Sequence, residues 1–140
     1  MGRTFEISFF SELYNIKATI TDILRFLLEA APRMDSEDLY ELRLIFSELM
    51  CNAVIHGNRQ DMSKKVNVSV EVTTGHISAC VTDEGAGFDY VSFLRRAAKC
   101  DDLTVEHGRG IYLVYTLADS LSFNMNGNQI RFNKRLRLNG

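Results

Sequence analysis

The chain changes its hydrophobic period near its middle, and this change constrains the fold more than any other feature. Between residues 13 and 53 the apolar side chains recur at steps of three and four, which is typical of amphipathic helices. From Val66 to Val72 a valine stands at every second position, which is typical of a strand with one buried face. The order of these stretches predicts an α+β fold: a two-layer α/β sandwich with helices on one face of a mixed, mostly antiparallel sheet.

The helical pattern predicts three helices. Ser11 is the expected N-cap of the first, which ends at Ala31 because the next residue is proline. The second runs from residue 35 or 36 to about residue 56, and Gly57 is its expected C-cap. The third runs from about residue 108 to 118. Weak periodicity also favours a short helix around residues 90–98.

The predicted strands are residues 4–10, two strands that meet at a turn at Thr74-Gly75, and a final hairpin. Asn126-Gly127 predicts a two-residue turn in this hairpin. Its arms carry alternating apolar residues, which are Leu121, Phe123 and Met125 on the first and Ile130, Phe132, Leu136 and Leu138 on the second. Lys134 interrupts the apolar face of the second arm.

The composition fits one folded domain over residues 1–140, because 46% of the residues are hydrophobic and 24% are charged. The net charge is −2, and the last twelve residues carry four cations and no acid, so the rest of the chain is more acidic than the whole. An acidic body is a poor match for phosphate backbones, and we do not expect direct binding of nucleic acid. The three cysteines form no CxxC pair, which favours reduced thiols and a cytoplasmic protein, and no apolar run is long enough for a membrane span.

Three polar residues, Glu48, Asn52 and His56, stand four residues apart, so an α-helix places them along one face. For each residue alone, the simpler interpretation is a polar stripe on a solvated helix. Leu49 and Ala53 flank this stripe, however, which puts Glu48 and Asn52 near the edge of the buried face. A carboxylate one turn from a carboxamide suits a proton acceptor beside a ligand for a hard cation.

Asp83 follows the alternation of the strand before it, so its carboxylate is expected to point toward the core, where a charge without a partner is costly. The simpler interpretation of the segment from Asp83 to Gly87 is a turn. A carboxylate at the mouth of a pocket can accept a hydrogen bond from the exocyclic amine of adenine, whereas the carbonyl of guanine is repelled. Gly85 and Gly87 allow the backbone to come close to a flat ring.

The segment Gly108-Arg109-Gly110 opens the third predicted helix. Unpaired N–H groups and the helix dipole make such a start a natural phosphate site, and Arg109 would add positive charge. The simpler interpretation is a pair of glycines that start a helix after a loop. The chain has no GxxxxGK[ST], HRD or DFG motif, which excludes a P-loop protein and a protein kinase of the eukaryotic type.

In their order and spacing, these motifs together resemble the GHKL ATPase superfamily, whose members have the Bergerat fold. The matching strings are EL-x-x-NA-x-x-HG from Glu48 to Gly57, D-x-G-x-GFD from Asp83 to Asp89, and G-x-G from Gly108 to Gly110. Within the superfamily, the strings SELMCNAVIHGN and GRGIYLVYTLAD look most like the anti-sigma-factor serine/threonine kinases of bacteria. The resemblance extends over essentially the whole chain.

The resemblance implies a role for each matching residue. Glu48 matches the general base that takes the proton from a serine hydroxyl of a partner protein. Asn52 matches the ligand of Mg²⁺, and Asp83 matches the carboxylate that reads adenine. His56 lies in the same motif as Glu48, with a less defined role at the nucleotide.

The glycines and the loop between them match the remaining parts of the ATP site. Gly85 and Gly87 match the lining of the base site. Gly108 and Gly110 match the glycines that lie against the phosphates, and residues from about 90 to 107 match the lid.

The function that the resemblance implies is an ATP- and Mg²⁺-dependent kinase that phosphorylates a serine of a STAS-domain anti-anti-sigma protein and also sequesters a sigma factor, as a homodimer. An alternative of another class is a nucleotide-gated binding module without kinase activity. The chain departs from the family pattern at two places, and both departures concern the catalytic rate. Glu106 and His107 stand where the family often has a basic residue, and Gly127-Asn128 replaces a Gly-Thr pair of many relatives.

Overall fold

The computed structural model describes residues 2–87 and 106–137, and for residues 106–109 it describes the backbone only. Its elements in chain order are β1 (Arg3–Phe10), α1 (Tyr14–Ala30), α2 (Ser36–Asn52), the π-helix η1 (Ala53–Gly57), β2 (Lys65–Thr73), β3 (His76–Thr82), α4 (Glu106–Leu117), β4 (Ser120–Phe123) and β5 (Gln129–Arg135).

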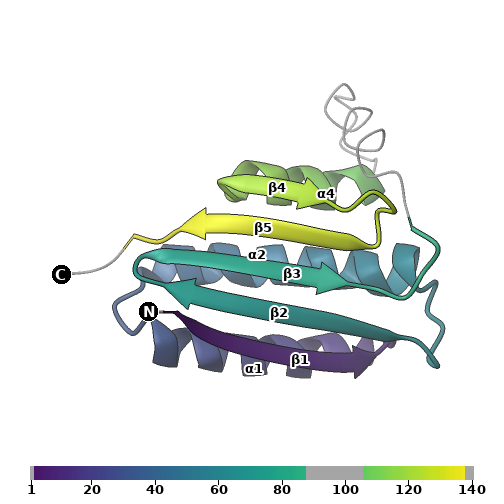
Figure 1. The fold of residues 1–140 in the computed structure, drawn as a ribbon, viewed down its shortest axis with the longest axis horizontal. Helices are drawn as coiled ribbons and strands as arrows, with labels where there is room; N and C mark the ends of the chain where they lie inside the picture. Colours follow the sequence, from purple (N-terminus) through teal and green to yellow (C-terminus); the bar gives the residue numbers. More distant parts are fainter. Residues whose placement is uncertain (1, 88–105, 138–140) are drawn as a thin grey trace.

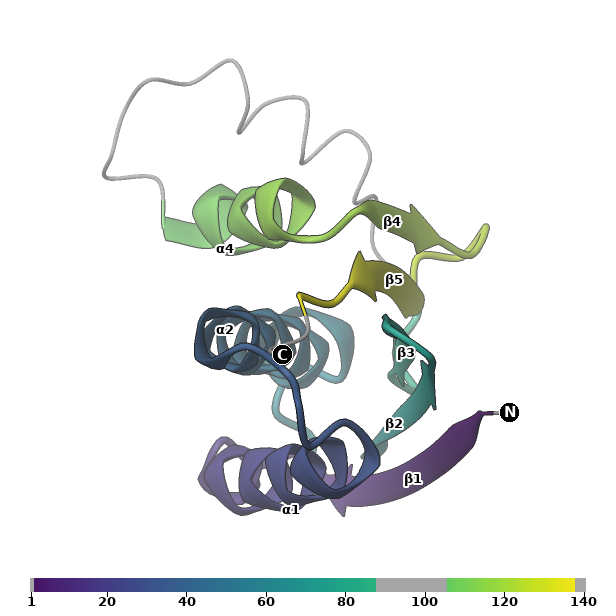
Figure 2. The ribbon, with the colours of Figure 1, turned by 90° about the vertical axis from the view of Figure 1, so that its left-hand side faces the viewer.

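The five described strands form one sheet in the order β1-β2-β3-β5-β4, and each neighbouring pair is antiparallel. The helices α1, α2 and α4 all lie on one face of this sheet (Figure 1, Figure 2). The predicted class, an α+β sandwich of two layers, is confirmed.

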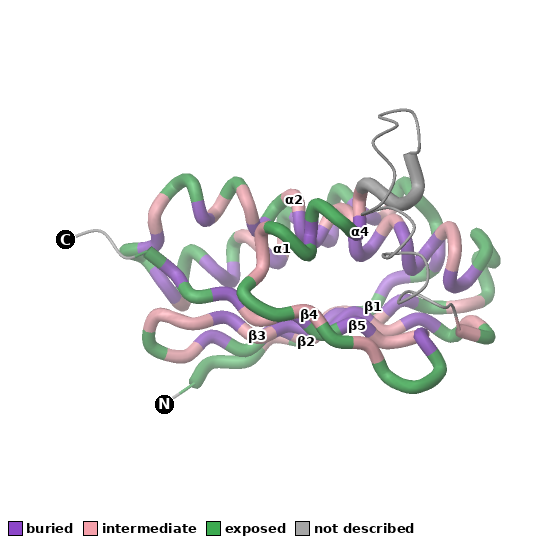
Figure 3. Tube along the Cα trace, turned by 90° about the horizontal axis from the view of Figure 1, so that it is seen from above, coloured by how far each residue is buried: buried purple, intermediate pink, exposed green. Residues whose placement is uncertain are grey.

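The core lies between the two layers, where buried residues of both face one another (Figure 3). The register explains why the alternating valines are needed, because Val68 pairs with Val81 and Val81 pairs with Ile130 across three strands. On the helical side, the ring of Phe46 on α2 packs edge-on against Phe132 of β5, with ring centroids 5.3 Å apart. Both rings are fully buried.

The start of α1 differs from the prediction. The helix begins at Tyr14, and its N-cap residue Leu13 makes no side-chain capping bond. Ser11 is not the cap, because its backbone N–H donates to the carbonyl of Lys64 and its buried hydroxyl accepts a hydrogen bond from Asn58. The hydroxyl therefore joins two loops instead of capping a helix.

The start of α2 confirms the prediction, and its end corrects it. Asp35 is the N-cap and accepts a hydrogen bond of 2.7 Å from the backbone N–H of Glu37. The α-helical hydrogen bonds end at Asn52, and the chain continues as one wider turn in η1. Gly57 lies inside η1 and is not the C-cap, which is Asn58.

The final hairpin has a longer loop than the sequence predicts. Asn126-Gly127 lies within residues 124–128, which join β4 to β5, and Gly127 has a φ of +75°. The side chain of Asn124 closes this loop, because its carbonyl oxygen accepts from the backbone N–H groups of Asn128 and Gln129. Met125 is consequently outside the strand and fully exposed.

Lys134 does interrupt the apolar face of β5, and an ionic network accommodates it. Its nearly buried ammonium group donates to Glu41 over 2.7 Å and to the carbonyl of Leu117, at the end of α4, over 3.1 Å. Arg137 donates to the fully buried Asp38 over 2.6 and 3.0 Å. Burial opposes the ionisation of Asp38, but the hydrogen bonds and charge of Arg137 and the charge of Lys134 together lower the pKa of its carboxyl group. The network ties α2 to β5 and α4.

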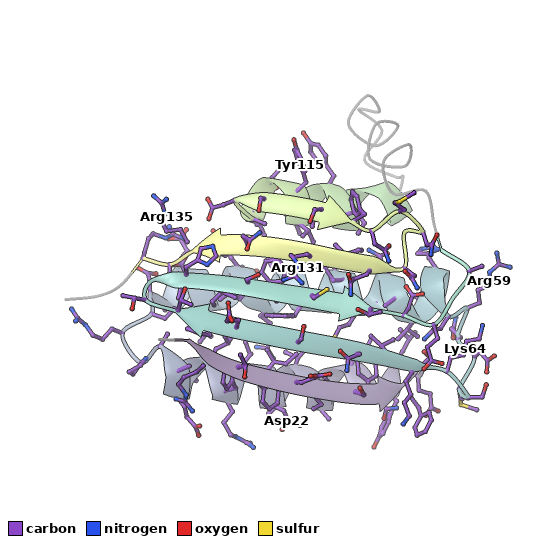
Figure 4. All side chains as sticks on the ribbon, in the orientation of Figure 1. Asp22, Arg59, Lys64, Tyr115, Arg131 and Arg135 are labelled. Atoms are coloured by element: carbon purple, nitrogen blue, oxygen red, sulfur yellow. The ribbon has the colours of Figure 1, made fainter. Side chains whose placement is uncertain are left out.

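Substitution of Lys134 tests how much this network stabilises the fold. Lys134→Ala is expected to lower the free energy of unfolding by about 3–5 kcal/mol, because buried carboxylates lose a cation that neutralises them. Urea unfolding measures this change. Arg135→Ala is the matched control, since this neighbouring cation extends into solvent (Figure 4) and its removal should change stability by no more than about 0.5 kcal/mol. Equal unfolding midpoints for the two variants would contradict the assignment.

Two further predictions concern helices. Among the described residues, no helix combines the length and the hydrophobicity that crossing a membrane requires. The short helix predicted around residues 90–98 lies outside the described residues, as does most of the lid predicted over residues 90–107.

Candidate active site

The three motifs meet at one end of the molecule. The C-terminal end of α2 with η1, the end of β3 and the start of α4 all lie at the right-hand end of the view in Figure 1. Antiparallel order explains this, because β3 leads toward that end of the sheet while β2, which follows η1, starts there. Residues that are far apart in the chain are thereby placed around one region.

Asp83 is the most buried acidic group of this region, with 5% of its surface exposed. One carboxylate oxygen, Oδ1, accepts a 2.8 Å hydrogen bond from the backbone N–H of Gly85, whereas no described residue donates to Oδ2. Burial raises the pKa of Asp83, although the Gly85 hydrogen bond and the positive charge of Lys64 partly oppose the rise. Within the described part of the chain, Oδ2 is therefore an acceptor without a donor, and it packs against Gly57.

Two glycines make room for this carboxylate. A Cβ atom on Gly57 would lie 2.2 Å from Oδ2 of Asp83, and one on Gly85 would lie 1.9 Å from the carbonyl oxygen of Gly57. The second distance excludes a side chain at Gly85, because the opposing atom belongs to the backbone, and the first means that a side chain at Gly57 would displace the carboxylate of Asp83. Gly57 is thus required for close packing against Asp83, which is the physical reason why the predicted C-cap role is wrong.

Gly87 has a different environment from Gly85. Its φ is +103°, and a Cβ atom there would lie 1.8 Å from the carbonyl oxygen of Asn126. The glycine therefore lets the segment after β3 pack against the loop between β4 and β5. A contact of Gly87 with a flat ring stays a prediction.

Glu48 of α2 lies against the beginning of α4. A Cβ atom on Gly110 would come within 2.1 Å of its Oε2, so any other residue at this position would displace the Glu48 carboxylate. The carboxyl group is half-buried, and burial raises its pKa. Among the described residues it has no hydrogen-bond or ion-pair partner, which leaves the carboxylate available to take a proton.

Asn52, one turn after Glu48, contains an unsatisfied polar group. Its Nδ2 atom is buried and has no hydrogen-bond partner among the described residues. Buried amide groups without a partner are rare, because each costs about 1–3 kcal/mol. Rotation of the carboxamide by 180° exchanges its oxygen and nitrogen, so the same position can present an oxygen to a cation. The donor set fits a hard cation that takes its other ligands from elsewhere.

His56 and the α4 motif are less fully defined. His56 is half-exposed in η1, and since the π turn begins directly after Asn52, the argument from regular α-helical spacing does not extend to it. Gly108 and Arg109 lie in the first turn of α4, which begins at Glu106, and the Arg109 side chain is outside the described part. Backbone N–H groups at this start are placed as an anion site requires.

Sequence reasoning missed Asn58, which directly follows η1. The side chain is 1% exposed, its Oδ1 accepts from the backbone N–H of Glu84, and its Nδ2 donates to the hydroxyl of Ser11 and the carbonyl of Lys65. The available signal was an asparagine directly after the end of a helix, where its amide can bond backbone groups of other segments.

The fold and this constellation of residues belong together in one class of protein. Residues 12–134 match the family model described as "Histidine kinase-like ATPase domain". The match covers most of the chain, and the chain belongs to this family of ATPase domains, which implies ATP binding.

More particular similarities point to anti-sigma factors. The chain is 26% identical to the anti-sigma F factor of Clostridium perfringens strain 13 over 122 residues, which are 86% of each chain. Identity to the anti-sigma F factor of Bacillus subtilis strain 168 is 27% over 118 residues, 81% of this chain and 80% of that one. Identity to the anti-sigma F factor of Geobacillus kaustophilus is 32% over 74 residues, which are 53% of this chain and 49% of that protein.

A solved structure confirms the fold. The crystal structure of the RsbU and RsbW domains of a Mycobacterium tuberculosis protein superposes with a TM-score of 0.69 at 17% identity. The superposition covers 98% of this chain and 33% of that chain. The Bergerat-type arrangement predicted from the motifs is therefore present.

Proposed function

We propose that this chain binds ATP with Mg²⁺ and transfers the terminal phosphoryl group to a serine hydroxyl of a STAS-domain anti-anti-sigma protein, and that it also sequesters a sigma factor. The similarity to anti-sigma F factors supports the choice of partners. The observation that carries the kinase proposal is Glu48, a half-buried carboxyl group with a raised pKa that lies against the start of α4. A protein that only bound nucleotide would have no need of this group.

Recognition of the adenine ring of ATP is assigned to Asp83. Its Oδ2 would accept a hydrogen bond from the exocyclic amine of adenine, and the engagement of Oδ1 with Gly85 supports this assignment. Guanine has a carbonyl oxygen at the corresponding place, and two acceptors repel each other. The buried carboxylate therefore selects ATP over GTP.

The triphosphate is assigned to the start of α4 and to Asn52. Gly108, Arg109 and Gly110 belong to the first turns of that helix, where N–H groups and the dipole favour anions. Asn52 would hold Mg²⁺, which when bound neutralises phosphate charge and aligns the phosphate chain. Among the described residues no group of three or more His, Cys, Asp or Glu side chains could hold a metal ion.

The transfer step then needs one proton acceptor. Glu48 takes the proton from the serine hydroxyl while the serine oxygen bonds to the terminal phosphorus. The bond from this phosphorus to the oxygen bridging the last two phosphates breaks, and ADP leaves with the electron pair. Because its pKa is raised toward neutral pH, Glu48 is a better proton acceptor than an exposed glutamate.

Incubation of the protein with ATP labelled in the terminal phosphate and with purified STAS-domain proteins tests the proposal. The expected result is label in acid-stable phosphoserine on one of these proteins. Binding of ATP without any transfer would instead support the nucleotide-gated switch, which is favoured by Glu106 and His107 at a position that is often basic in the family.

A further inference from the structure

Asn58 joins three segments of the chain beside Asp83. Both hydrogens of its Nδ2 are used, one toward the hydroxyl of Ser11 after β1 and one toward the carbonyl of Lys65 at the start of β2, over 2.9 Å. Its Oδ1 accepts the backbone N–H of Glu84 over 2.8 Å. The residue is 1% exposed; the bond to Ser11 is buried, and the other two bonds are partly buried.

Only a carboxamide satisfies these neighbours. The backbone N–H of Glu84 requires an acceptor, and the backbone carbonyl of Lys65 requires a donor, which fixes the orientation of the Asn58 amide. Aspartate lacks the donor, and an apolar residue lacks both. The backbone of Asn58 is held as well, because its N–H donates to the carbonyl of Ala53 over 2.8 Å. The amide is a rigid point of attachment at the end of η1.

The bond to Glu84 fixes the turn that carries the free oxygen of Asp83. Glu84 lies between Asp83 and Gly85, whose own N–H bonds Oδ1 of Asp83. On its other side the turn is held by Asn128, whose carbonyl accepts the N–H of Asp83 over 2.9 Å. Loss of the Asn58 bond leaves the turn with hydrogen bonds to another segment on one side only, at Asn128.

We propose that Asn58 is a positioning residue for purine recognition, which acts by holding the turn from Asp83 to Gly85 so that Oδ2 of Asp83 faces the base. This inference rests on the proposed function, since it needs ATP to bind at Asp83. It assigns to Asn58 a part in affinity for the base and in discrimination between ATP and GTP. Asn58 has no part in phosphate binding or in the transfer step at Glu48.

Calorimetric titration of Asn58→Ala with the magnesium salts of ATP, GTP and inorganic triphosphate tests this assignment. The dissociation constant for ATP is expected to rise about tenfold, the cost of roughly one buried hydrogen bond, and the preference for ATP over GTP should shrink correspondingly. Affinity for triphosphate should stay within about twofold, as should kcat at saturating ATP while KM rises.

Ser11→Ala is the matched control, because it removes another buried hydrogen bond of the same amide and leaves the bond to Glu84 in place. It is expected to lower stability but to keep the wild-type preference for ATP over GTP. Hydrogen exchange at the Glu84 amide should become faster in Asn58→Ala and stay slow in Ser11→Ala. If Asn58→Ala does not fold, Asn58→Ser, whose side chain is too short to span the gap, carries the same expectations.

The inference is overturned if the Asn58 variant keeps the wild-type ATP-to-GTP ratio, or if its affinity for triphosphate falls as far as its affinity for ATP, which indicates general loosening. Absence of ATP binding by the unmodified protein is a separate outcome, and it overturns the proposed function itself.

Discussion

Asp83→Asn is expected to weaken ATP binding about 100-fold, equivalent to about 2.7 kcal/mol, and to remove the preference for ATP over GTP. The carbonyl oxygen of the new carboxamide can still accept the hydrogen bond from Gly85. Its NH₂ group then occupies the place of Oδ2 and meets the amine of adenine, so that two donors face each other. The carbonyl of guanine finds a donor instead. Calorimetry with both nucleotides measures the change.

The same substitution is expected to leave the fold intact or to stabilise it. Because burial raises the pKa of Asp83, folding favours its protonated form, and stability from this group declines as the pH rises through that pKa. A neutral side chain does not incur this cost at neutral pH. Asp22→Asn, on the exposed side of α1 (Figure 4), is the control and should alter neither nucleotide affinity nor the unfolding midpoint. Unchanged ATP affinity in Asp83→Asn would refute the assignment of the base site.

Glu48→Gln is expected to reduce the rate of phosphoryl transfer about 1,000-fold while the dissociation constant for ATP changes by less than about twofold. Glutamine has the shape of glutamate and can occupy the same space beside Gly110, but it cannot take a proton. In the unmodified protein the rate should rise with pH through the raised pKa of Glu48 and then level off. This rise should disappear in the variant.

An acidic residue at the opposite end of the same helix provides the control for this experiment. Glu37 lies in the first turn of α2 and is exposed, so Glu37→Gln should transfer phosphate at the normal rate. Single-turnover measurements with saturating ATP separate the transfer step from binding. Normal phosphorylation of the partner by Glu48→Gln would show that another group acts as the base.

Much of the fold could be predicted because one face of each element is buried. The alternation from Val66 to Val72 survives in the structure as β2, and continuing the alternation of β3 placed Asp83 inside correctly. The start of α2 could also be predicted, since Asp35 caps the helix by a hydrogen bond with the backbone of Glu37, two residues away. These signals arise between residues that are close in the sequence, so they can be recognised without the structure.

The errors arose where the deciding partner is distant in the sequence. Gly57 is a residue type that is typical of a helix end. Its role comes instead from Asp83, which the sheet places next to it. Ser11 is a residue type that is typical of a helix N-cap, yet its hydroxyl accepts a hydrogen bond from Asn58. The interruption of the apolar face at Lys134 was predicted correctly, but the acids of α2 that accommodate its charge were not. No periodicity argument reveals such long-range pairings.

The helix α4 is held at both of its ends by groups from other elements. The carbonyl of Leu117, at the end of α4, accepts a hydrogen bond from Lys134, and Gly110, near its beginning, lies against the carboxylate of Glu48. A shift of α4 along its axis would therefore disturb the position of the Glu48 carboxylate. Phosphates bound at the start of α4, as proposed, would contact the same helix that packs against Glu48, so we expect phosphate binding and the position of this carboxylate to be linked.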